Sequence, residues 1–417
     1  MKKIIEWMNE SFAPRMNKVT RNPWVAAIQG AITGVLPLIL VGSLITLISI
    51  LNDYIPGMPN LHPISDFSFG LISLFIAFLA PYYIMDKLQK EDRRLVAALT
   101  GVALFLMLLA PEFTEGTITF AFERFGANGM FVSLFVGIFV GFVFYQFSKF
   151  SFFKKSSSLP DFIIVWFDTI LPILFLLVTG WLLTIVGSFD LYSGILSAFE
   201  PLNKIGQSFI GFVFITFICV FLYSFGISPW ALFPILFPIW IAGVEQNSIL
   251  VSQGLSPNNI HVMETLIAWI WFGGMGSTLP LVILMLVSAK SKHLKALGKV
   301  TITPSYFNIN EPVIFGTPIA FNPILMVPMW LNGIMLPTVT YIILNVGIVD
   351  IPQSVMHLWY LPFGISTFII SPSFQAIMLL LVNLTIAFII WYPFFKVFDN
   401  QKLRGETDKL HSENLEG

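Results

Sequence analysis

A carboxylate surrounded by apolar residues is the feature of this sequence with the clearest capacity for chemistry. Glu311 lies in the segment SYFNINEPVIFGTPIAFNP (305–323), where it is flanked by Asn308, Asn310 and Asn322. A carboxylate buried without a partner is strongly destabilising, so Glu311 should be protonated, hydrogen-bonded or functional. A carboxylate and two amides can bind the hydroxyl groups of a sugar. Alternatively, Glu311 is a structural carboxylate that caps a broken helix inside the protein.

Helix-breaking residues interrupt the same segment. Pro312, Pro318 and Pro323, together with Gly316, are incompatible with one continuous helix. We therefore expect a re-entrant hairpin with exposed backbone carbonyls around Glu311.

Two other apolar segments are broken and carry hydroxyl or indole groups. In SFGISPWALFPILFPIW, Ser228 precedes a proline, and Trp230 and Trp240 either stack on a sugar face or only anchor a membrane interface. In WFGGMGSTLP, Ser277 and Thr278 offer hydroxyls, but the glycines are equally explained by close helix packing.

Three more positions have both a functional and a structural interpretation. Asn128 and Gly129 in FGANGMF form either a polar lip of a substrate cavity or simply a helix start. His357, in HLWYLPFG, is either a structural hydrogen bonder or a proton carrier. Asp168, in the apolar run WFDTI, is a second intramembrane carboxylate and therefore a further functional candidate.

The composition indicates an integral membrane protein. Apolar residues make up 56% of the chain and charged residues 11%, and the mean hydropathy is +0.83. A formal charge of −1 argues against a nucleic-acid-binding protein, and the single Cys219 excludes disulfides and cysteine-ligated metal sites. We expect no metal ion or other cofactor. The polar, amphipathic N-terminus shows no cleavable signal.

The apolar runs predict an all-α, polytopic fold with about ten transmembrane helices. A span needs about 20 mostly apolar residues. The candidates lie at 27–51, 67–85, 95–111, 130–148, 162–187, 206–225, 229–243, 264–289, 324–348 and 367–395.

The placement of basic residues predicts the orientation. Twenty of the 22 Lys and Arg residues fall in five clusters, separated by even numbers of predicted spans. The positive-inside rule then places the clusters and both termini in the cytoplasm. Residues 300–395 contain no Lys or Arg but many Pro, Gly and Asn. Unwound backbone at membrane depth requires a protein or water-filled surrounding, so this stretch is the expected substrate site.

The same patterns suggest a division of the chain. The predicted parts are an amphipathic cytoplasmic N-terminus (1–24), an N-terminal half (25–190), an interfacial amphipathic linker (191–205), a C-terminal half (206–398) and a charged cytoplasmic tail (399–417).

Several of these stretches resemble one known family. The chain resembles the membrane-embedded IIC subunit, or permease, of the lactose/cellobiose type in the bacterial phosphoenolpyruvate-dependent sugar phosphotransferase system. The segment FNINEPVIFGTPIAFNP is similar to the family signature around its essential Glu. Supporting matches, which extend over almost the whole chain, are LPLILVGS, FGANGMFVSLFVGI, GSTLPL, PSYFNINEP and WYPFFKVFD.

The resemblance implies an architecture and partners. The protein would be a homodimer in the bacterial cell membrane, with two re-entrant hairpins in each protomer. The N-terminal half would dimerise, and the C-terminal half would carry the sugar in an elevator-like motion. A separate cytoplasmic IIB protein, itself supplied by IIA, would pass a phosphoryl group from its phosphocysteine to the sugar. Whether this chain is itself an enzyme stays open at this point.

The resemblance also assigns roles to particular residues. Glu311 would bind the sugar near its phosphorylated hydroxyl, with Asn310 beside it, and Trp359 would stack on the sugar. Asn128 and Gly129 would line the pocket.

One departure from the family pattern bears on the chemistry. The family usually has Gly-Ile-His-Gly where this chain has Gly-Ile-Ser-Pro, so Ser228 stands in place of the His. Ser228 can donate a hydrogen bond but cannot take up a proton near neutral pH, and His357 is a possible substitute.

Three hypotheses follow. The first is a sugar permease subunit coupled to phosphorylation, whose substrate is a mono- or disaccharide, with a β-linked disaccharide favoured. The second is a facilitator or sensor that does not support phosphoryl transfer. The third is an ion-coupled transporter that uses Glu311 and Asp168.

Overall fold

The structure is a computed structural model, and it describes most of the chain. The described residues are 22–49, 59–127, 129–151, 160–227, 229, 232–317, 319–357 and 359–416. Predictions that concern Asn128, Ser228, Trp230, Pro318 and most of the segment 1–24 lie outside the described residues.

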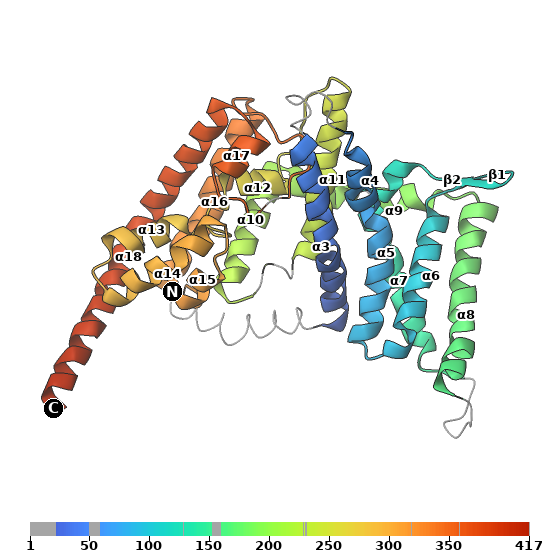
Figure 1. Cartoon of the computed structure of the whole chain (residues 1–417), viewed down its shortest axis with the longest axis horizontal. Coiled ribbons are helices and arrows are strands. Elements are labelled where there is room, and N and C mark those ends of the chain that lie inside the picture. The colour runs from blue at the N-terminus through green and yellow to red at the C-terminus, as the bar shows by residue number, and fades with distance from the viewer. Residues whose placement is uncertain are drawn as a thin grey trace. The chain divides into compact units, whose positions relative to one another are not determined.

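The described chain forms two units, each with its own internal packing. The N-terminal unit comprises Asn17–Lys204 and Trp230–Ala242, and the C-terminal unit comprises Ile205–Pro229 and Gly243–Gly417. Helices dominate both units, as the cartoon shows (Figure 1). The all-α, polytopic fold class predicted from the apolar runs is confirmed.

The N-terminal unit is built from long helices joined by short turns. Its elements are α3 (Pro23–Ser49), α4 (His62–Ser68), η3 (Phe69–Leu71), α5 (Ile72–Lys87), η4 (Glu91–Arg93), α6 (Arg94–Leu108), β1 (Glu112–Thr114), β2 (Thr117–Thr119), η5 (Phe122–Phe125), α7 (Gly129–Phe147), α8 (Asp161–Trp181), η6 (Leu182–Val186) and most of α9 (Leu191–Gln207). The two strands form an exposed antiparallel hairpin.

Small residues allow α5, α6 and α7 to lie side by side in this unit (Figure 1). A Cβ atom at Gly137 would collide with Ala80, and one at Gly141 would collide with Ile84. Small side chains permit this kind of close helix contact in a membrane, where apolar burial alone does not favour association. The core between these helices is otherwise apolar, with Phe105 and Phe144 fully buried.

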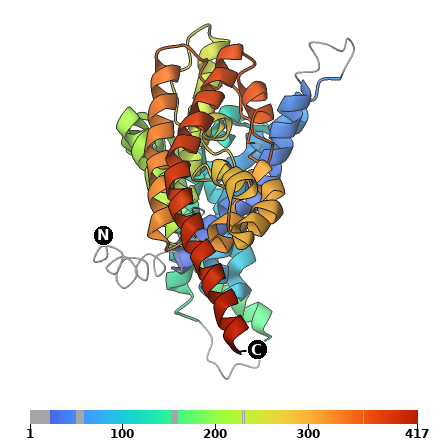
Figure 2. The same cartoon turned by 90° about the vertical axis from the view of Figure 1, so that its left-hand side faces the viewer.

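The C-terminal unit combines long helices with short, interrupted ones. Its elements are α10 (Phe209–Ser224), the end of α11 (Phe233–Ser252), α12 (Met263–Trp269), α13 (Leu279–Ser288), α14 (Lys292–Tyr306), α15 (Glu311–Gly316), α16 (Pro323–Asn345), α17 (Ile365–Ile370) and α18 (Phe374–Glu416). The turned view shows α18 as one long helix that runs past α16 (Figure 2).

Polar side chains hold the long helix α18 against the rest of this unit. Asn383 Nδ2 donates to the Trp269 carbonyl at 2.9 Å and to Thr340 Oγ1 at 2.8 Å. Trp391 Nε1 donates to the Ser277 carbonyl at 2.9 Å. Further along α18, Asp399 accepts hydrogen bonds from the backbone N–H groups of Lys290 and Ser291, which immediately precede α14.

Among the described residues, seven helices are long and apolar enough to cross a membrane, or eight if the bent pair α9–α10 counts as one span. The predicted span at 95–111 corresponds to α6, which has 15 residues. The predicted span at 264–289 is broken into α12 and α13 by the intervening loop. The number of ten spans and the re-entrant hairpins stay predictions.

A buried histidine joins the loop after α11 to the end of α9. His261 is fully buried, and its Nδ1 lies 2.8 Å from the carbonyl oxygen of Gly206. Because a carbonyl only accepts, Nδ1 carries the proton in this contact. Gln207 adds two hydrogen bonds, to the backbone N–H and the carbonyl of His261. Burial lowers the pKa of the His261 imidazole to about 4, although the Gly206 hydrogen bond opposes this shift.

The pKa of His261 predicts a pH dependence of stability. The folded protein holds the imidazole neutral, whereas the unfolded chain takes up a proton below about pH 6.5. The free energy of unfolding should therefore fall as the pH drops from about 6.5 toward 4, by roughly 1 kcal/mol per pH unit from this group. In His261→Asn, whose amide retains the donor, thermal unfolding should depend less steeply on pH. His62→Asn, at an exposed histidine, is the matched control, and an unchanged slope in His261→Asn would contradict the assignment.

Candidate functional site

The turn between α14 and α15 presents the Asn-Glu-Pro segment of the C-terminal unit. Pro304 lies in the last turn of α14, and Asn308 then adopts a left-handed backbone conformation with φ of 60°. Asn is among the few residues that tolerate this region. Helix α15 starts at Glu311, with Pro312 in its first turn, where the missing N–H costs nothing.

Asn308 ties this turn to two other segments. Its Oδ1 accepts a hydrogen bond from the Gly273 N–H at 3.0 Å. Its Nδ2 donates to the carbonyl oxygens of Trp359 and Leu361, both at 2.9 Å. Both donors of the amide and one lone pair of its oxygen are thereby used inside the protein. Asn308 is therefore a structural link between the 270–278 loop, the Asn-Glu-Pro turn and the loop that carries Trp359.

Asn310 makes a second link to the same loop. It is buried, its Nδ2 donates to the Met275 carbonyl at 2.6 Å, and its Oδ1 accepts from the Tyr223 hydroxyl at 3.3 Å. Gly274 has a φ of 89°, and a Cβ atom there would collide with the Asn310 side chain. The sequence prediction that Asn310 contacts a ligand stays untested, while its place beside Glu311 is as expected.

Glu311 is exposed at the start of α15, in contrast to the two asparagines on which its position depends. The phenol of Tyr223 lies within electrostatic range of its carboxylate. An exposed carboxylate on a rigid turn can accept hydrogen bonds from the hydroxyls of a ligand. The role of Glu311 in binding a sugar stays a prediction.

The hydroxyl groups of Ser277 and Thr278 point into the protein. Ser277 Oγ donates to the Ile270 carbonyl and Thr278 Oγ1 to the Gly273 carbonyl, both at 2.6 Å. Both residues are buried. In this conformation the two hydroxyls stabilise the unwound 270–278 loop, which corresponds to the packing interpretation of the segment.

His357 forms a buried pair with Glu264, a residue that the sequence analysis missed. Both side chains are fully buried, and Glu264 Oε1 lies 2.9 Å from His357 Nδ1. The same oxygen accepts the Met356 N–H at 2.8 Å. The pair fastens α12 to the loop that carries Trp359, which is itself half-buried. Glu264 is the only Asp, Glu, Lys or Arg between Glu245 and Lys290, and that isolation was the available signal.

Asp168 and Gly129 belong to the N-terminal unit. Asp168 is buried, and its Oδ2 lies 3.1 Å from Nη2 of Arg93, also buried. This ion pair joins α8 to the start of α6, so the structure gives Asp168 a local structural partner. Gly129 is buried at the start of α7, where a Cβ atom would meet the Arg124 carbonyl and Ser73. Asn128 and Ser228 lie outside the described residues.

The C-terminal unit thus offers one exposed carboxylate on a frame of internally bonded polar residues. In the part of the chain that the structure describes, no group of three or more His, Cys, Asp or Glu residues is arranged to hold a metal ion. The arrangement suits recognition of a neutral, hydroxyl-rich ligand in a helical membrane protein.

Comparison with known proteins identifies the class. The profile of the family "Phosphotransferase system, EIIC" matches residues 29–333. The chain belongs to this family, and the resemblance stated from its sequence motifs is confirmed. It is a multi-pass membrane permease component.

Three relatives illustrate the similarity. The cellobiose-specific EIIC component of Geobacillus stearothermophilus is 28% identical, over 97% of this chain and 96% of the relative. The lactose-specific EIICB component of Staphylococcus haemolyticus (strain JCSC1435) is 26% identical, over 99% of this chain and 74% of the relative. The crystal structure of ChbC, the IIC component of an N,N'-diacetylchitobiose-specific phosphotransferase system, matches with a TM-score of 0.83 and 25% identity. That match covers 96% of this chain and 99% of ChbC.

We expect the buried pair of Glu264 and His357 to contribute measurably to the stability of the folded protein. Removing one partner of a buried hydrogen-bonded pair typically costs about 1–3 kcal/mol for each polar group left without its counterpart. Glu264→Ala should therefore lower the thermal stability strongly, and Glu264→Gln, which retains an acceptor for the Met356 N–H, should lower it less. Glu200→Ala, which removes an exposed partner of Lys204, is the control and should have little effect. Equal melting temperatures for Glu264→Ala and the control would contradict the buried pair.

Proposed function

We propose that this chain binds a β-linked disaccharide and moves it across the cytoplasmic membrane, coupled to phosphorylation by a separate IIB protein. The observation that carries the proposal is the exposed Glu311 on its hydrogen-bonded frame, in a chain of the EIIC family. Cellobiose, lactose and N,N'-diacetylchitobiose, named for the relatives, are all β-linked disaccharides. They share the hydroxyl groups that a carboxylate acceptor recognises.

In this proposal, Glu311 accepts a hydrogen bond from the sugar hydroxyl that becomes phosphorylated. The S–P bond of the IIB phosphocysteine breaks, and the cysteine leaves as a thiolate, as an O–P bond forms to that hydroxyl. The proton of the hydroxyl passes by way of the Glu311 carboxylate to water. The phosphate adds negative charge beside the Glu311 carboxylate. Like charges repel, so the product should bind less tightly than the free sugar and leave to the cytoplasm. Trp359, two residues from the buried His357, is proposed to stack on the sugar ring.

The partners and the orientation are part of the proposal. IIC components act with a IIB protein, and the lactose-specific relative is an EIICB component. For this chain we propose a IIB protein on a separate polypeptide, supplied by IIA, and a homodimer with both termini in the cytoplasm. We further propose that the C-terminal unit carries the sugar by an elevator-type motion.

Ser228 supports a second candidate function. It stands where the resembling family usually has a His, and a hydroxyl cannot exchange a proton near neutral pH. His357 pairs with Glu264 in a fully buried site, which favours a structural role for its imidazole. The alternative is therefore a sugar facilitator or sensor that does not support phosphoryl transfer.

Transport in vesicles distinguishes these functions. The purified chain is reconstituted and supplied with labelled cellobiose, lactose or N,N'-diacetylchitobiose, with or without phosphorylated cellobiose-type IIB. We expect phosphorylated sugar to accumulate only when phosphorylated IIB is present. Downhill uptake of free sugar without any IIB requirement would favour the facilitator, and dependence on a proton or sodium gradient would favour an ion-coupled transporter.

Glu311→Gln tests the binding group directly. The neutral amide removes the charged acceptor, and charge-assisted hydrogen bonds are about twice as strong as neutral ones. We expect sugar binding, measured by calorimetry, to fall below detection while the melting temperature changes little, since Glu311 is exposed. Asp350→Asn, at another exposed carboxylate of the same unit, is the matched control and should bind sugar normally. Normal binding by Glu311→Gln would refute the role of Glu311.

A further inference from the structure

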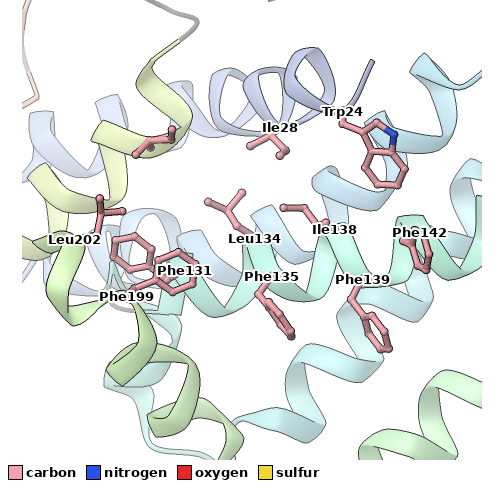
Figure 3. Close-up of a pocket in the computed structure, with 11 residues that line it drawn as sticks. Trp24, Ile28, Phe131, Leu134, Phe135, Ile138, Phe139, Phe142, Phe199 and Leu202 are labelled. Atoms are coloured by element: carbon pink, nitrogen blue, oxygen red, sulfur yellow. The ribbon is translucent and has the colours of Figure 1, made fainter. Parts of the chain in front are cut away.

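An apolar groove runs along α7 in the N-terminal unit. The groove has a volume of about 680 Å³. Side chains of α3, α7, α9 and α11 form its walls (Figure 3). This volume lies within the range of about 300–1,000 Å³ that ligand pockets occupy. Every lining side chain is aliphatic or aromatic, and the Trp24 indole supplies the only polar side-chain atom. A sugar would find no hydroxyl-binding groups here, so the groove suits a hydrocarbon chain.

The groove face of α7 differs from the face that packs against a neighbouring helix. Phe135, Ile138 and Phe142 form the groove stripe and are 47%, 39% and 48% exposed. The small residues of α7 lie elsewhere, since Gly137 and Gly141 contact α5. Helix interfaces in membranes are enriched in small residues that allow close approach. A stripe of bulky side chains is better suited to an acyl chain than to another helix.

One end of the groove is amphipathic. Trp24 and Phe142 lie at that end, and Phe131 and Phe199 close the other (Figure 3). The Trp24 ring contacts the Tyr145 ring edge-on, with centroids 6.5 Å apart. Lys149 Nζ lies 4.5 Å from the centroid of the same Tyr145 ring.

The Lys149 ammonium at this end of the groove can bind a phosphate. Lys149 Nζ donates one hydrogen bond to Gln146 at 2.8 Å, and an ammonium has three donors. Tryptophan, tyrosine and lysine side chains are typical of the boundary between hydrocarbon and headgroups. The apolar space, the aromatic rings and the positive charge follow one another in an order that matches the acyl chain, the glycerol backbone and the phosphate of an anionic phospholipid.

We propose that this groove is a binding site for an anionic phospholipid, with one acyl chain along α7 and the headgroup phosphate at Lys149. The acyl chain fills the apolar space between α3 and α7, and the aromatic pair Trp24–Tyr145 lies at the level of the glycerol backbone. The charge on Lys149 selects an anionic headgroup over a zwitterionic one. The site stands independently of the proposed sugar transport, because none of the groove residues is among those assigned to the sugar.

Native mass spectrometry of the full chain in detergent tests the site. The protein is titrated with phosphatidylglycerol or with phosphatidylcholine of the same acyl chains, and the bound fraction is measured for each. We expect the first phosphatidylglycerol to bind more tightly than phosphatidylcholine. Lys149→Gln should reduce this preference about fivefold, the effect of one basic residue near an anionic lipid. Lys149→Arg should retain the preference.

A groove-filling variant tests the acyl-chain position. Ile138→Trp should lower the binding of both lipids, and Phe135→Trp serves in its place if that variant does not fold. Leu174→Trp adds the same ring at an exposed position of α8 outside the groove and should leave binding unchanged.

Three results would overturn the proposal. The first is equal binding of the two lipids to the unmodified chain. The second is a phosphatidylglycerol preference that Lys149→Gln leaves intact. The third is a groove-filling variant that binds lipid normally but changes from dimer to monomer by light scattering, which would assign the groove to a second copy of the chain.

Discussion

The structure of the C-terminal unit depends on one constraint: unwound backbone within a membrane protein must find its hydrogen bonds inside the protein. The loop between α12 and α13 is the clearest case, because its backbone does not continue the regular hydrogen-bond pattern of a helix. Side-chain amides replace the missing helix bonds. Asn308 accepts from Gly273, and Asn310 donates to Met275. The loop also uses its own hydroxyls, as when Thr278 bonds to the Gly273 carbonyl.

This constraint decides which polar groups remain for a ligand. Asn308 and Asn310 lie in the same short turn as Glu311. Their side-chain amides, however, are already hydrogen-bonded to backbone groups or to Tyr223. Glu311 begins α15 on the exposed side of that turn. The asparagines therefore fix the backbone of the turn that carries Glu311. A backbone that is already fixed loses little conformational entropy when a ligand binds.

The sequence predicts the broken helices well and singles out Glu311 as a candidate, because prolines, glycines and isolated charges are local signals. It does not predict which groups pair across the fold. Glu264 and His357 are 93 residues apart, and Arg93 and Asp168 are 75 residues apart. Both alternatives for His357 were compatible with its local sequence, and only the fold brought Glu264 to its imidazole. Ser277 and Thr278 likewise could have pointed either way, because hydroxyl orientation depends on backbone geometry that no spacing rule encodes.

The polar network also bears on the elevator-type motion that we propose. The bonds between α18 and the α12–α13 loop, the Asn308 links and the Glu264–His357 pair all join residues of the C-terminal unit. A displacement of that unit as one body would break none of them. If these bonds crossed to the N-terminal unit, each step of transport would expose buried polar groups at a cost of about 1–3 kcal/mol apiece. These polar groups of the broken helices are hydrogen-bonded within their own unit. The unit can therefore move through a hydrocarbon layer without exposing these groups.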